Sequence, residues 1–131
     1  MDYSNDEQLE KELQELYILA KHWSADLDFL EEELTFFKNI QRKYPDPASI
    51  QTFEKKVLQL ETHLGNLRVN IPRFLDFMAP FIANPNKPMG LDFLEKYNAL
   101  ATELHQLFND VRATKRELFA HTETLMPHAC G

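Results

Sequence analysis

The sequence predicts an all-α protein, an up-down-up antiparallel bundle of three long helices with coiled-coil-like packing. Apolar residues recur at alternating steps of four and three over three long segments, which places one apolar stripe along one side of each helix. Proline-containing segments separate these repeats. Only three glycines occur in 131 residues, which argues against an all-β fold with many tight turns.

The first apolar repeat predicts a helix over about residues 5–44. Ser4 or Asn5 can cap its start by accepting a hydrogen bond from a free N–H of the first turn. Pro45 ends it, because the residue before a proline is pushed out of helical angles. The repeat consists of Leu9, Leu13, Leu16, Ala20, Trp23, Leu27, Leu30, Leu34, Phe37, Gln41 and Tyr44.

The second repeat predicts a helix over about residues 47–83, with Asp46 as its cap and Pro47 in the first helical position. Pro72 lies inside it, where a proline removes a backbone hydrogen bond at a cost of ~3 kcal/mol. Because the repeat keeps its phase across Pro72, we favour one kinked helix over a helix broken near Pro72. The repeat consists of Ile50, Phe53, Val57, Leu60, Leu64, Leu67, Ile71, Phe74, Met78 and Phe81.

The third repeat predicts a helix over about residues 91–126, which Pro127 ends, followed by a flexible tail over 127–131. This helix has a wider apolar face than the other two, since three further apolar residues (Phe93, Leu100 and Leu107) flank the repeat. The repeat consists of Leu94, Tyr97, Ala101, Leu104, Phe108, Val111, Lys115, Leu118, Thr122 and Leu125.

The whole chain, residues 1–131, is expected to form a single helical-bundle domain. The short connections force sequential helices to lie antiparallel. Since the three predicted helices have nearly equal lengths, they are expected to pack along their full extent. Pairing the helices across their connections predicts a central layer of Trp23, Ile71 and Leu104.

Charge and composition exclude several classes of partner. The net charge is −7, with the acidic excess concentrated in the first 44 residues, and negative charge repels a phosphate backbone. No run approaches the ~18 apolar residues of a membrane span. The start of the sequence does not resemble a signal peptide, and the one cysteine, Cys130, has no intramolecular partner. We therefore expect a cytoplasmic protein that binds neither nucleic acid nor membrane.

Motifs for catalysis or metal binding are missing from the sequence. None of the five histidines follows an acidic residue at the Glu-x-x-His spacing of di-iron bundles. The serines lack a nearby histidine and acid that could activate a nucleophile, and no glycine-rich phosphate loop occurs. The sequence thus predicts a non-enzymatic protein without catalytic residues, cofactor or metal.

An aromatic stripe on the first predicted helix is the leading candidate for a functional surface. Phe29 and Phe36 repeat seven residues apart beside the core stripe, and Ile40 follows them. Exposed aromatic surface of this kind marks interaction sites. Either the third helix covers these side chains, or they contact a protein partner, which can be a second copy in a homodimer or another protein.

The alternative function is binding of a small ligand or a metal near the Pro72 kink. His22 and Asp26 are four residues apart and face the same way on a helix. Pockets between bundle helices are common places for small molecules. The residues that the pairing of the helices brings near the kink are His22, Trp23, Asp26, Arg68, Arg73 and His105.

Overall fold

The computed structural model describes the backbone of residues 2–45, 50–84 and 92–125. Its side chains are described within residues 11–45, 51–84 and 92–123. The capping residues expected for the first two helices (Ser4 or Asn5, and Asp46) and the predicted tail lie outside the described side chains.

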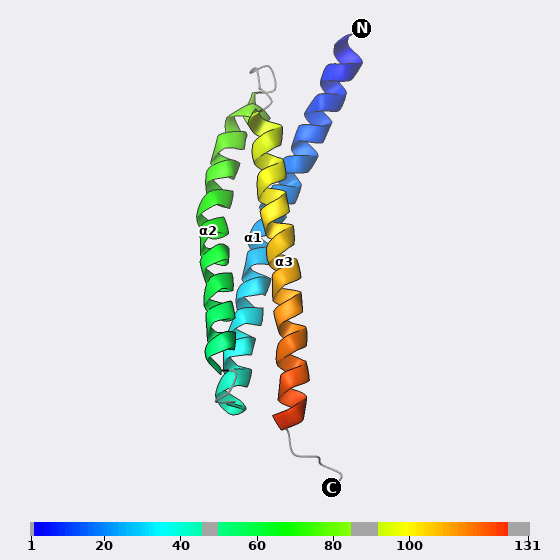
Figure 1. Cartoon of the computed structure of the whole chain (residues 1–131). Helices are drawn as coiled ribbons and strands as arrows, with labels where there is room; N and C mark the ends of the chain where they lie inside the picture. Colours follow the sequence, from blue (N-terminus) through cyan, green and yellow to red (C-terminus); the bar gives the residue numbers. More distant parts are fainter. Residues whose placement is uncertain (1, 46–49, 85–91, 126–131) are drawn as a thin grey trace.

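Three helices form the described chain: α1 (Asp2–Lys43), α2 (Ile50–Ala83) and α3 (Asp92–Leu125). They pack against one another and alternate in direction (Figure 1). The predicted all-α, up-down-up bundle is therefore confirmed, and the described residues include no strand. The helix bounds lie within one turn of those expected, which is ordinary for helix ends.

The core is a continuous line of apolar side chains along the bundle axis. On α1 and α2 it follows the predicted repeats, and Leu30, Phe37, Leu67 and Ile71 are completely buried. The two helices together contribute Leu13, Ala20, Trp23, Leu27, Leu30, Leu34, Phe37, Phe53, Val57, Leu60, Leu64, Leu67, Ile71, Phe74 and Met78.

Between Leu94 and Lys115, the core face of α3 differs from the predicted repeat at every second position, whereas Thr122 is buried as predicted. Leu94 was expected inside but is 46% exposed, whereas its neighbour Phe93 is 2% exposed. Leu107, expected only to flank the repeat, is completely buried, and Lys115 lies at the edge of the core. Over most of α3 the core line is therefore rotated by part of a turn, and it consists of Phe93, Tyr97, Leu100, Leu104, Leu107, Val111, Thr114, Leu118 and Thr122.

The three helices do not match in length, contrary to expectation. α1 has 42 residues, whereas α2 and α3 have 34 each. At 1.5 Å per residue the difference is about 12 Å. The amino-terminal end of α1 accordingly projects beyond the end of the bundle where α2 ends and α3 begins (Figure 1). Close to this projection, Ile18 and Leu19 are about half exposed.

α2 is one helix that continues through Pro72 and Pro80, so the alternative of two separate helices is wrong. Both prolines are exposed. Their missing N–H groups therefore lie on the solvent side, where water can bond to the carbonyl groups left unpaired. Figure 1 shows α2 bowed, with its convex side away from the other helices. The prolines thus favour a curve that wraps α2 around the core.

Ion pairs connect each pair of helices at the surface. Lys38 of α1 pairs with Glu61 of α2 at 2.6 Å, and Lys115 of α3 pairs with Glu33 of α1 at 3.0 Å. Such exposed pairs contribute only about 0–1 kcal/mol each. They indicate the relative register of the helices, whereas the stability comes from the buried line.

The rotated face of α3 can be tested with two identical substitutions. Leu107→Ala removes a completely buried side chain, so we expect a loss of about 2–5 kcal/mol in the free energy of unfolding. Leu94→Ala removes a side chain that is 46% exposed, and its cost should be below about 1 kcal/mol. Urea denaturation followed by circular dichroism measures both. Equal losses, or a larger loss at Leu94, would contradict the described orientation of α3.

Candidate interaction surface

Four phenylalanine rings lie along the seam where α1 meets α3. Phe29 of α1 stacks on Phe108 of α3, with ring centroids 6.4 Å apart. Phe36 of α1 meets Phe119 of α3 edge-on at 6.0 Å. Phe29, Phe36 and Phe119 remain 51%, 40% and 39% exposed, and Phe108 is partly buried. We call these four residues the aromatic face.

Helical spacing explains how both helices turn extra apolar side chains toward the same seam. Phe29 and Phe36 are two turns apart, and Phe108 and Phe119 are three turns apart, so each pair lies on one side of its helix. Both pairs lie next to the core line rather than in it. Since α1 packs less extensively on α3 than on α2, this side of the bundle leaves the rings half covered.

The structure leaves the residues predicted for this surface exposed to different degrees. Phe29 and Phe36 lie on the surface, and α3 covers them only in part. Ile40 is partly buried against the core, so it adds little exposed area. Phe119 was not predicted. Its spacing of eleven residues from Phe108, three full turns, is the signal in the sequence that could have identified it.

Exposed charges of opposite sign flank the aromatic face. Glu32 lies between Phe29 and Phe36 on α1, and Arg112 and Arg116 lie between Phe108 and Phe119 on α3. All three charged residues are exposed, and none forms an ion pair with a described residue. The α1 side of the surface is therefore acidic and the α3 side is basic.

Trp23, predicted near the kink, lies in an aromatic cluster of the core. It is 7% exposed, and its ring centroid is 5.1 Å from that of Tyr97 and 6.3 Å from that of Phe74. The expected layer partners were Ile71 and Leu104; Phe74 lies about one turn from Ile71, and Tyr97 lies about two turns from Leu104. Burial raises the pKa of Tyr97 above its ordinary value, because desolvation disfavours the phenolate.

The predicted metal ligands do not assemble. His22 and His105 are exposed and Asp26 is half-buried. These three side chains form no group that could hold a metal ion, and neither do any three or more His, Cys, Asp or Glu residues in the described part of the chain.

Arg68 has a structural role in the described molecule. Its guanidinium donates hydrogen bonds to Asp28, at 2.8 Å, and to Glu31, which joins α2 to α1. The bond to Asp28 is the main reason that the pKa of Arg68 is raised, and Glu31 adds to the effect. This arginine is therefore engaged by α1 rather than free to hold a ligand.

Arg73 lines a shallow groove of about 300 Å³ between α2 and α3. Phe74, Phe77 and Lys96 also line it, and the Lys96 ammonium lies 4.8 Å from the centre of the Phe77 ring. Trp23 is not among its lining residues. Of the six residues predicted for a ligand site at the kink, only Arg73 borders this groove, and the ligand site stays a prediction.

No family model, curated protein or solved structure matches the chain. Among the described helices, none combines the length and apolar character needed to cross a membrane.

The buried phenol of Tyr97 predicts a specific alkaline response. An unfolded tyrosine ionises near pH 10, whereas the folded protein keeps Tyr97 protonated to higher pH. The unfolded chain then binds fewer protons than the folded one, so the free energy of unfolding falls as the pH rises from about 10 toward the folded-state pKa. Tyr97→Phe should resemble the wild type at neutral pH and lose less stability above pH 10. Parallel curves from denaturation at stepped pH would show that Tyr97 is not the cause.

Proposed function

We propose that this protein functions by protein–protein association rather than catalysis, and that a second copy of the chain docks on the aromatic face. The half-exposed rings of Phe29, Phe36 and Phe119 carry this proposal. Interface centres are enriched in aromatic residues and arginine, and a few such residues supply most of the binding energy. The aromatic face combines both residue types in one stretch of surface.

The large exposed surface of the bundle supports the proposal that a second copy covers part of it. The chain exposes 9144 Å². Compact monomers of this mass expose about 7,200 Å² by the usual scaling of surface with mass. The projecting end of α1 and a core that is one line of side chains deep both contribute to the excess. A second bundle laid against the α1–α3 seam would cover rings that a single core leaves in water.

The charges beside the rings favour one orientation of the two copies. A two-fold axis parallel to the bundle sets α1 of each copy opposite α3 of the other. Glu32 of one copy then faces the Arg112 and Arg116 level of its partner, so opposite charges meet. An axis across the bundle would set α1 against α1 and bring the two Glu32 side chains toward each other. The proposed dimer is therefore parallel.

Acidic substitutions in the aromatic face should separate the copies. Phe29→Glu combined with Phe36→Glu places two charges at the proposed contact, so we expect the dissociation constant to rise at least about 100-fold, with the circular dichroism unchanged. Val69→Glu is the matched control, because Val69 of α2 is also 51% exposed but lies away from the aromatic face. Sedimentation equilibrium measures the mass. A wild type that stays monomeric at millimolar concentration would overturn the homodimer.

Charge reversal tests the orientation of the two copies separately. In the parallel dimer, Glu32→Arg puts like charges together and should weaken association several-fold, and adding Arg112→Glu should restore it. In a dimer with α1 against α1, Glu32→Arg would exchange one like-charge pair for another, so it should leave association nearly unchanged, and adding Arg112→Glu would restore nothing. Absence of rescue in the double variant therefore contradicts the parallel arrangement.

A further inference from the structure

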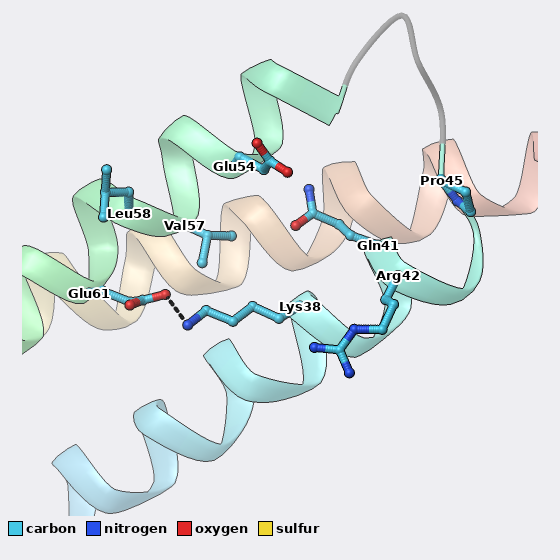
Figure 2. Close-up of a pocket in the computed structure, with 8 residues that line it drawn as sticks. All are labelled: Lys38, Gln41, Arg42, Pro45, Glu54, Val57, Leu58 and Glu61. Carbon is cyan, nitrogen blue, oxygen red and sulfur yellow. Dashed lines mark ion pairs between the residues drawn. The ribbon is translucent and has the colours of Figure 1, made fainter.

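A second concave surface lies at the other flank of α1, where the end of α1 meets the start of α2. This groove has a volume of about 600 Å³. It differs from the aromatic face, which lies on the α3 side of α1. Figure 2 shows the side chains that line it: Lys38, Gln41, Arg42, Pro45, Glu54, Val57, Leu58 and Glu61.

Gln41 is an unusual residue for its position. It continues the apolar repeat of α1 one turn after Phe37, where an apolar side chain would pack without cost. Its Nε2 is buried and has no hydrogen-bond partner among the described residues. Buried amide donors in folded proteins are nearly always satisfied, and leaving one unsatisfied costs free energy. The amide points from α1 toward α2 and Glu54 (Figure 2), and a small rotation of the Gln41 side chain into the groove would let a ligand acceptor satisfy it.

The groove holds one available charge of each sign. Lys38 and Glu61 neutralise each other at one end through their ion pair at 2.6 Å. Arg42 of α1 and Glu54 of α2 also line the groove, and neither forms an ion pair with a described residue. Glu54 would repel a small anion in the groove, and Arg42 would repel a small cation. A ligand that carries both charges matches the groove.

Apolar side chains supply the remaining wall. Val57 is 4% exposed and belongs to the core, whereas Leu58 is 64% exposed at the rim. Pro45 borders the groove from the end of α1. A ligand side chain that packs on Val57 and Leu58 would remove apolar surface from water, which is the usual source of affinity for small ligands.

We propose that this groove binds a small zwitterion of the α-amino acid type with an apolar side chain. The ligand carboxylate accepts hydrogen bonds from Gln41 Nε2 and the Arg42 guanidinium. The ligand ammonium pairs with Glu54. The ligand side chain lies against Val57 and Leu58. This site does not depend on the homodimer, because it uses the α2 side of α1.

Titration of the full chain with L-leucine, followed by heteronuclear NMR, tests the proposal directly. Saturable shifts are expected at the end of α1 and the start of α2. N-acetyl-L-leucine lacks the ammonium and L-leucinamide lacks the carboxylate, so each should bind at least about 10-fold more weakly, as expected for loss of a charge-assisted contact. Absence of saturable shifts at about 10 mM L-leucine, or equal binding of all three compounds, would overturn the proposed ligand class.

Gln41→Met separates a binding role from a structural one. Methionine has a similar length and removes the unsatisfied donor, so we expect the variant to be at least as stable as the wild type and to bind L-leucine at least about 10-fold more weakly. Gln59→Met is the control, since Gln59 is exposed on α2 and does not line this groove. It should leave both properties unchanged. Undiminished affinity in Gln41→Met, or a loss of stability, would contradict the role given to Gln41.

Discussion

Burial of apolar side chains at a repeat of 3.5 residues holds the three helices together, and the positions of the other features depend on it. Leu30, Phe37, Leu67, Ile71 and Leu107 are completely buried along one axis. A core of this kind is long but only one line of side chains deep. The bundle is stable because the line is continuous. The same geometry leaves the side chains next to the line half covered, and both candidate surfaces lie there.

The three sides of the bundle differ because of how the chain connects the helices. A short connection joins α1 to α2, and Arg68 and Lys38 add ion pairs between them. No direct connection joins α1 to α3, which run in the same direction, so packing and the ion pair between Lys115 and Glu33 set their separation. Their side of the bundle is packed least extensively, and it is the side where Phe29 and Phe36 meet rings of α3.

The sequence predicts the core correctly where the apolar pattern fits only one face of a helix. In α2 one line alone satisfies the pattern, and the predicted residues from Phe53 to Met78 all lie in the core. At the end of the helix, Ile82 packs against the core in place of the predicted Phe81. In α3 two alternative core lines, the predicted one and the observed one, share Tyr97, Leu104, Val111 and Leu118. Between these shared residues the two lines use adjacent residues, whose side chains point about 100° apart around the helix. Both lines are apolar, and only Lys115 in the predicted line indicated the other choice.

The candidate sites could likewise be predicted only where the sequence pattern determines which way a helix face points. Phe29 and Phe36 could be predicted because their spacing places them beside the core line of their own helix. The spacing of Phe119 from Phe108 puts both residues on one side of α3, but only the rotation of α3 places that side beside Phe29 and Phe36. The orphaned amide of Gln41 depends on which atoms surround it, and a sequence pattern does not contain that information. Metal binding at His22, Asp26 and His105 required a face of α1 and a face of α3 to converge, and the described structure does not bring them together.

The two proposed surfaces share α1, which raises the question of whether they are coupled. The aromatic face uses the side of α1 toward α3, and the groove uses the side toward α2. Leu34 and Phe37 lie between them, 2% and 0% exposed. Linking the surfaces would require α1 to rotate or slide, and either motion would withdraw these side chains from a closely packed core. Ligand binding at Gln41 and association through Phe36 should therefore act independently.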